Sequence, residues 1–192
     1  MMPMMFRSAV LCVVGALVAT VGVLVAPTSS AVPATSVAGA SVTFTNYTTA
    51  NGLGNNWVLG VYAVGATVYA ATDGGLSIST DGGANFTNRT TTNGLGSNTV
   101  YGVYALDDTV YAATYGGLSI STDGGANFTN YTTGLGSNTV LGVYAVDDTV
   151  YAATLGGLSF PTDGSYFTNR TTANGLGSNT VLGVYAVDDT VY

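Results

Sequence analysis

The side chains able to do acid–base or nucleophilic chemistry are nearly all aspartates. The sequence has ten Asp and three Arg, and no Glu, Lys or His. A pair of carboxylates across a cleft is the machinery of many glycoside hydrolases. Other bases and nucleophiles come mostly from His, Lys or Cys, and the one cysteine, Cys12, lies in an apolar N-terminal run. We therefore expect that this chain alone is not an enzyme, and we expect no metal site and no cofactor.

The positions of the aspartates favour a structural role. Adjacent pairs stand at Asp107-Asp108, Asp147-Asp148 and Asp188-Asp189, each between two apolar runs. Asp suits hairpin turns because its carboxylate accepts hydrogen bonds from nearby backbone N–H groups. We interpret these repeated acidic turns as solvated edges of the fold, with weak calcium binding as the alternative.

One motif, repeated about every 42 residues, makes up most of the chain. Phe44, Phe86, Phe128 and Phe167 begin equivalent segments, with spacings of 42, 42 and 39 residues. Each unit is rich in Thr, Val, Tyr and Gly and has four short strand patterns separated by Gly- and Asp-containing turns. Four antiparallel strands in this length are typical of a propeller blade. The predicted fold is an all-β β-propeller of four-stranded antiparallel blades.

The period also sets the expected boundaries. A strand-like segment from Val42 to Thr48 opens the repeats, and the predicted units cover residues 42–85, 86–127, 128–166 and 167–192, the last one truncated. The chain thus supplies three full blades plus partial ones. Open blade faces and strand edges are unfavourable. We therefore expect an incomplete ring that needs self-association or further blades for closure.

The strand that follows the Phe-containing segment of each unit is apolar nearly throughout, as expected for a strand covered on both faces. Val58 to Val64 is the first copy, and the others cover residues 100–106, 140–146 and 181–187. A glycine weakens a strand unless another backbone must come close. We therefore expect these strands to crowd around a central axis at their shared glycines, Gly60, Gly102, Gly142 and Gly183.

The N-terminus has the pattern of an export signal. Arg7 precedes an apolar run from Ala9 to Ala26, and small residues suitable for cleavage follow near Ala31. We expect a signal peptide at residues 1–31, a spacer at 32–41, and a secreted or extracytoplasmic protein. The alternative is an uncleaved anchor that holds the protein at the cell surface.

The Asp-Gly-Gly turns resemble the Asp-box (BNR) repeat of sialidases and other secreted propellers, Ser-x-Asp-x-Gly-x-Thr-Trp. The matching residues are Ser79, Asp81, Gly83 and Phe86, then Ser121, Asp123, Gly125 and Phe128, with Asp163 in a worn third copy. The resemblance implies structural roles for these residues: the carboxylate accepts N–H groups, glycine takes positive φ, and the aromatic ring fills the gap between blades.

The sialidase reaction itself does not carry over. Members of that family share an arginine triad and a Tyr–Glu pair, whereas only Arg89 and Arg170 follow the N-terminal segment, and Glu is absent. A second stretch, Asn93 to Leu118, resembles the two-component-regulator propeller repeat of periplasmic sensors. Both resemblances imply the fold and leave the ligand open.

Candidate ligand contacts are the residues that depart from the repeat in the connections. Trp57 and Tyr115 depart in this way, and Asn56 and Asn98 of the Asn-rich connections are expected on the same face. A net charge of −7 opposes nucleic-acid binding. We interpret the chain as an exported, non-catalytic propeller scaffold that binds a glycan or a protein. The alternatives are a non-catalytic portion of a larger sialidase-like enzyme, or the extracytoplasmic sensor domain of a signalling receptor.

Overall fold

The computed structural model describes residues 45–161, 167–187 and 190–192. The chain divides into two compact units, Met1–Asn46 and Tyr47–Tyr192, and the fold described below is that of the second. The expected signal peptide at 1–31 and spacer at 32–41 lie outside the described residues.

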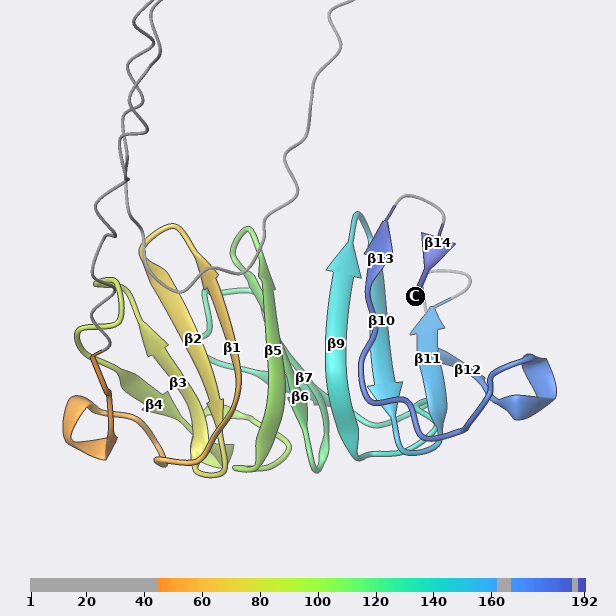
Figure 1. Cartoon of the computed structure of the whole chain (residues 1–192), viewed down its shortest axis with the longest axis horizontal. Helices are drawn as coiled ribbons and strands as arrows, with labels where there is room; N and C mark the ends of the chain where they lie inside the picture. The colour runs from red at the N-terminus through yellow and green to blue at the C-terminus, as the bar shows by residue number, and fades with distance from the viewer. Residues whose placement is uncertain (1–44, 162–166, 188–189) are drawn as a thin grey trace, which may run out of the picture. The chain divides into compact units, whose positions relative to one another are not determined.

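The second unit contains three four-stranded antiparallel sheets and one two-stranded sheet (Figure 1). The first sheet consists of β1 (Val58–Val64), β2 (Thr67–Thr72), β3 (Gly75–Ser79) and β4 (Thr87–Arg89). The second consists of β5 (Val100–Leu106), β6 (Thr109–Thr114), β7 (Gly117–Ser121) and β8 (Thr129–Tyr131). The third consists of β9 (Val140–Val146), β10 (Thr149–Thr154), β11 (Gly157–Pro161) and β12 (Phe167–Arg170), and the short sheet of β13 (Ala186–Val187) and β14 (Thr190–Val191).

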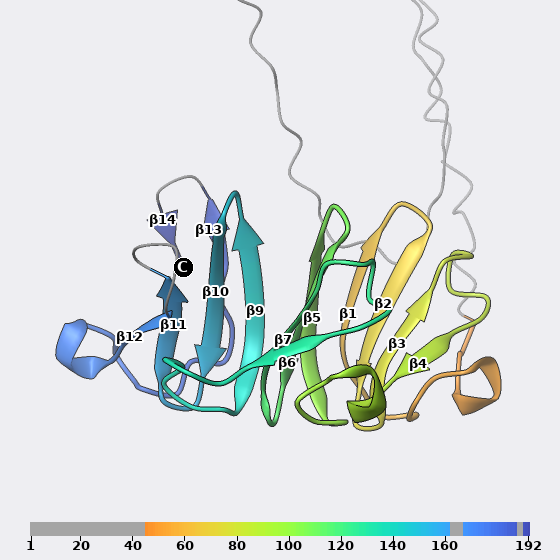
Figure 2. The same cartoon turned by 180° about the vertical axis from the view of Figure 1, so that it is seen from behind.

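Each four-stranded sheet runs in sequence order from its first strand to its fourth. The first strands contact one another in order, β1 with β5, β5 with β9, and β9 with β13 (Figures 1 and 2). These are blades of a β-propeller, and the predicted fold class is confirmed. We call the sheets blades 1 to 4 in chain order.

Three local expectations were wrong or incomplete. The segment 45–48 forms no strand, although a strand was expected from Val42 to Thr48. The strand expected over 181–187 is reduced to Ala186–Val187, because its partner β14 pairs with only these two residues. Three 3-10 turns in the connections were not predicted: η1 (Thr49–Asn51), η2 (Thr91–Asn93) and η3 (Thr172–Asn174).

Capping explains the 3-10 turns. Thr90 Oγ1 accepts the Thr92 N–H, and Asn93 Oδ1 accepts the Thr90 N–H, a reciprocal pair of caps repeated at all three turns. A glycine with positive φ follows each turn, such as Gly94 (φ 93°). The third connection lacks the residues equivalent to Thr92 and Asn93 and has no 3-10 turn.

The first-strand glycines lie where the blades meet. A Cβ built on Gly60 would stand 3.0 Å from the Tyr101 carbonyl oxygen and 3.4 Å from the Gly102 Cα of the next blade. On Gly142 it would stand 3.2 Å from the Gly183 Cα. The expectation that these glycines allow close backbone approach is thus confirmed.

Beside the glycines runs a stack of tyrosine rings that links all four blades. Tyr62, Tyr104, Tyr144 and Tyr185 follow one another with centroid separations of 4.9, 4.7 and 4.8 Å. We call these residues the tyrosine ladder. Burial of the Tyr104 phenol, together with the neighbouring Tyr62 and Tyr144, raises the pKa of Tyr104 above its ordinary value of 10.0.

The hydrophobic core lies between blades. Between blades 1 and 2, Leu76 and Ile78 pack with Val100, Val110 and Phe128 from the next blade. The second interface joins Leu118 of blade 2 to Val140 of blade 3. Because each core is shared by two blades, an isolated blade would expose an apolar face.

In blades 1 to 3, a polar cluster forms around a fully buried serine. In blade 2, Ser119 Oγ donates to Asn130 Oδ1 (3.0 Å) and accepts the Gly96 N–H (3.0 Å). Asn130 Nδ2 donates to the Gly116 carbonyl (2.9 Å), and Thr114 Oγ1 donates to the Gly117 carbonyl (2.8 Å). Blades 1 and 3 repeat the cluster around Ser77 and Ser159. Each connection is thereby tied to the middle of its sheet.

Candidate ligand-binding site on the connection face

The antiparallel strands sort the turns onto two faces of the propeller. Turns after the first strands of blades 1 to 3 and after the third strands of blades 1 and 2 lie at the upper end in Figure 1, and turns after the second strands lie at the lower end. We call the upper end the acidic face, because it receives the Asp pairs and the Asp-Gly-Gly turns. The lower end is the connection face: it receives the long connections between blades, one of which carries Trp57, and the turns after the second strands, one of which carries Tyr115.

The Asp pairs on the acidic face form hairpin turns. Asp107 and Asp147 have φ values of 52° and 51°, and Gly65 takes φ 58° at the same place in blade 1. Asp tolerates this left-handed conformation better than most residues. The third pair, Asp188 and Asp189, lies outside the described residues.

The Asp-Gly-Gly turns are held by a compact set of hydrogen bonds. In blade 2, Ser121 Oγ donates to Asp123 Oδ1 (2.7 Å) and accepts the Gly125 N–H (2.8 Å). Asp123 Oδ1 also accepts the N–H groups of Ala126 (3.0 Å) and Asn127 (2.9 Å). The blade 1 turn repeats the pattern with Ser79, Asp81 and Asn85.

Positive φ and aromatic packing complete these turns. Gly83 and Gly125 have φ values of 95° and 89°. Phe128 is buried in the core between blades 1 and 2, whereas Phe86 is half-buried and meets Tyr47 edge to face at 6.3 Å. The third copy, including Asp163, lies outside the described residues.

These hydrogen bonds keep both carboxylates ionised. The side-chain amide and backbone N–H of Asn85, together with Ser79, lower the pKa of Asp81 to about 2. Hydrogen bonds from Ser121 and Asn127 likewise lower the pKa of Asp123 from its ordinary value. A general acid near neutral pH needs the opposite shift, so these carboxylates are not tuned to donate a proton.

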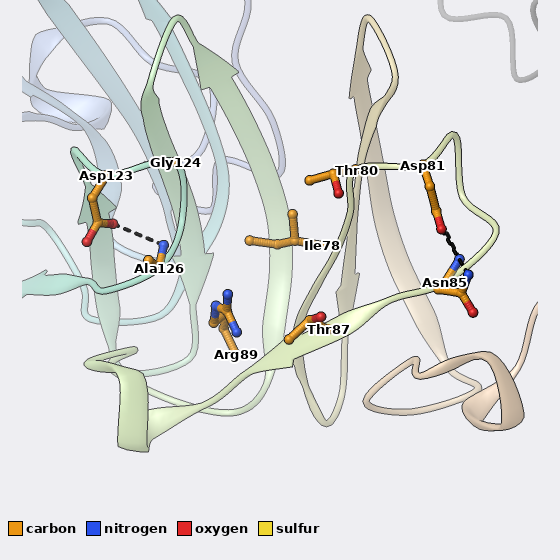
Figure 3. A pocket seen from close by; sticks show the side chains of 9 residues that line it. All are labelled: Ile78, Thr80, Asp81, Asn85, Thr87, Arg89, Asp123, Gly124 and Ala126. Atoms are coloured by element: carbon orange, nitrogen blue, oxygen red, sulfur yellow. Dashed lines mark hydrogen bonds between the residues drawn. The ribbon is translucent and has the colours of Figure 1, made fainter.

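A hollow of about 460 Å³ lies between the two Asp-Gly-Gly turns at the outer edge of blades 1 and 2 (Figure 3). Arg89 stands between Asp81 and Asp123 there, and its Nε donates to the Gly125 carbonyl (2.9 Å). Asp81 and Asp123 hold their own turns through hydrogen bonds, and Arg89 links blade 1 to blade 2. The charged groups around this hollow therefore have structural roles, and the hollow is not our candidate ligand site.

The connection face has a smaller hollow of about 200 Å³, lined by Trp57, Leu59, Asp73, Thr99 and Tyr101. Trp57 leaves 68% of its side chain exposed. The Asp73 N–H donates to the Trp57 carbonyl (3.2 Å), and Thr99 Oγ1 donates to Asp73 Oδ1 (2.9 Å). An indole, a carboxylate and a phenol therefore converge where blade 1 meets blade 2.

Tyr115 lies next to this hollow and does not line it. Its N–H donates to the Thr99 carbonyl (3.0 Å), and 61% of its side chain is exposed. Thr99 thus links Tyr115 to Asp73, and Asp73 links to Trp57. Of the aromatic candidates, the structure brings Trp57 into a hollow and leaves Tyr115 at the margin.

Asn56 and Asn98 hold the connections through their amide oxygens. Asn56 Oδ1 accepts the Thr49 N–H (2.8 Å), and Asn98 Oδ1 accepts the Thr91 N–H (2.9 Å). Asn179 does the same for Thr172 in the last connection. These asparagines fix the shape of the connection that carries Trp57 or Thr99.

Leu59, Thr99 and Tyr101 were not among the candidates chosen from sequence. Tyr101 had a detectable signal, because Leu occupies its position in the other units. Leu59 and Thr99 carry no such signal. In the part of the chain that the structure describes, no cluster of acidic, His or Cys side chains could hold a metal ion. Nor is any described helix long and apolar enough to cross a membrane.

Comparisons with known proteins agree on the architecture. No protein-family model matches the sequence, and no curated protein matches it either. Among solved structures, the extracellular domain of a proposed hybrid two-component system from B. thetaiotaomicron matches with a TM-score of 0.58 and 19% identity. The match covers 69% of this chain and 21% of that chain, so this chain spans about a fifth of that protein's solved length.

A second match is the computationally designed Ika4 protein, with a TM-score of 0.52 and 11% identity. It covers 70% of this chain and 82% of that chain. At these identities the likeness shows the fold alone.

Proposed function

We propose that this chain is an exported, non-catalytic binding module whose ligand contacts Trp57 on the connection face. The observation that carries the proposal is the exposed indole, 68% accessible, at the edge of a hollow that also holds Asp73 and Tyr101. Exposed aromatic side chains beside a few convergent polar groups are typical of ligand sites. Tyr115, Asn56 and Asn98 extend the same surface.

A glycan is the ligand class that these groups fit best. The face of an indole packs against the C–H groups of a sugar, and the Asp73 carboxylate can accept hydrogen bonds from sugar hydroxyls. Thr99 Oγ1 already orients that carboxylate. A protein segment would use the same aromatic anchor, and binding to glycan and peptide arrays distinguishes a glycan ligand from a protein ligand.

Two considerations support a non-catalytic role. The sequence has no Glu, His or Lys, and the carboxylates of the Asp-Gly-Gly turns, which we propose to be structural Asp-boxes, have lowered pKa values. As part of a longer protein, the module would serve a glycan-processing enzyme or a sensor in the same way, by holding the ligand. Export is tested by N-terminal sequencing of extracellular protein, which should begin near Val32 or Thr35.

Glycan arrays and a peptide array, probed with the wild-type chain and four variants, test the ligand site. Trp57→Ala should abolish binding, and Tyr115→Ala should weaken it. Leu155→Ala, at the position of Tyr115 in the next blade, and Asp123→Ala, on the other face, should leave binding unchanged at a temperature where they are folded. Peptide hits alone would assign a protein ligand. Glycan or peptide binding that is retained by the Trp57→Ala variant would show that the ligand site lies elsewhere.

A further inference from the structure

The first blade exposes a face that the later blades bury. Val58 and Val61 of β1 are 38% and 46% exposed, and Ala63 on the same face is exposed too. Val100 and Val140, the equivalents of Val58 in blades 2 and 3, are both 0% exposed. Val100 is buried because blade 1 packs against it. No described residue covers the corresponding face of blade 1.

The last blade exposes the opposite face. Leu182, Tyr185 and Tyr192 are 75%, 50% and 74% exposed. A Cβ built on Gly183 would meet no atom within 4 Å, whereas on Gly60, Gly102 and Gly142 it would approach the Cα of the next blade's glycine at 3.4, 3.7 and 3.2 Å. Gly183 packs on blade 3 through one side, and on the side to which its Cβ would point no described atom lies within 4 Å.

These two exposed faces are the two halves of an interface that the fold already makes. The contacts of β1 with β5, β5 with β9 and β9 with β13 repeat one arrangement, with glycine against glycine and tyrosine against tyrosine. The face of blade 1 copies the receiving half, and the two described strands of blade 4 copy the part of the donating half that surrounds the first-strand glycine and tyrosine. No charged side chain belongs to β1 or to residues 181–187, so the first strands bring no charge into the contact that would have to be desolvated.

We propose that a second copy of this chain covers these faces head to tail. Gly183 and Tyr185 of one copy pack on Gly60 and Tyr62 of the other, and the tyrosine ladder continues across the contact. Head-to-tail contacts either close into a ring or extend without limit. Two copies bring together six four-stranded sheets and two two-stranded ones, within the range of four to eight blades in a propeller ring, so we expect a closed dimer. The glycines and tyrosines of this contact are not among the residues that line the Trp57 hollow.

Sedimentation velocity on the full chain, over a wide concentration range, tests the proposal. The wild type should be a dimer whose mass does not grow further. Gly183→Val should be a folded monomer, because its side chain meets open space within one copy and meets the Gly60 backbone across the contact. Val58→Asp should raise the dimer dissociation constant about tenfold or more, since it places a carboxylate in the contact. Leu155→Asp is the matched control: it also places a charge on an exposed apolar residue, here 47% exposed, away from either face, and should stay dimeric.

A monomeric wild type would overturn the proposal, as would a Gly183→Val variant that remains dimeric. Species that keep growing with concentration would overturn the closed pair. Circular dichroism of each variant establishes that it is folded. Mass reports the dimer, and array binding reports the ligand site. Either proposal can therefore fail while the other holds.

Discussion

Removing the Ser119 hydroxyl is the sharpest test of how the blades hold their connections. Ser119 is fully buried, and its Oγ both accepts the Gly96 N–H and donates to Asn130 Oδ1, each at 3.0 Å. Ser119→Ala leaves both partners without this hydrogen bond. An orphaned polar group costs about 1–3 kcal/mol. Because Gly96 is only half-buried and Asn130 is exposed, we take the low end for each.

The expected loss is therefore about 2 kcal/mol of unfolding free energy. For a chain of 192 residues this corresponds to a fall in Tm of about 4–8 °C. Thermal unfolding followed by circular dichroism measures it. Thr122→Ala, an exposed hydroxyl deletion in the adjacent turn, is the control and should stay within about 0.5 kcal/mol of wild type.

A double-mutant cycle with Asn130→Ala separates the hydrogen bond from general packing effects. If Ser119 and Asn130 act together, their effects should fall short of additivity by about 1 kcal/mol. Fully additive effects, or a Ser119→Ala variant that melts with the Thr122→Ala control, would refute this explanation of the buried cluster.

Three further predictions concern stability. Leu118→Ala should cost about 3 kcal/mol because Leu118 is fully buried between blades, whereas Leu155→Ala at an exposed site should cost under about 0.5 kcal/mol; denaturant unfolding measures both. Asn85 helps to lower the pKa of Asp81 from 3.8 to about 2, so this stabilisation is complete above pH 3.8 and is lost as pH falls toward 2. Acid titration of Asp81→Asn should show a shallower loss than wild type, and an unchanged profile would contradict this. The pKa of Tyr104 is raised by burial, so its contribution is complete below pH 10.0 and is lost as pH rises above that value. Tyr104→Phe should unfold less steeply in alkali, and a steeper transition would show that the phenol is not the titrating group.

Much of the fold follows from local patterns because the chain repeats them. The period of about 42 residues, the apolar first strands and the recurring glycines predict blades that meet at Gly60, Gly102 and Gly142. The 3-10 turns were missed because three residues are too few for a helical period, although the Thr-x-x-Asn pairing of Thr90 with Asn93 is a visible capping signal.

The candidate site was harder to predict because it forms between blades. Trp57 and Tyr115 stood out as departures from the repeat. The hydrogen bond from Thr99 to Asp73 joins residues 26 positions apart, and it depends on the distance between adjacent blades. No local sequence pattern at Leu59 or Thr99 indicates that both residues line the same hollow as Trp57.

Fluorescence of Trp57 tests the central claim most directly, because it is the single tryptophan of the chain. Its indole is 68% exposed, so the free protein should emit as a solvated tryptophan. Titration with the glycan selected on the array should shift this emission to shorter wavelength with saturation, and Asp73→Asn should weaken the binding. Saturable glycan binding, measured by calorimetry, that leaves the Trp57 emission unchanged would contradict a ligand site on the connection face.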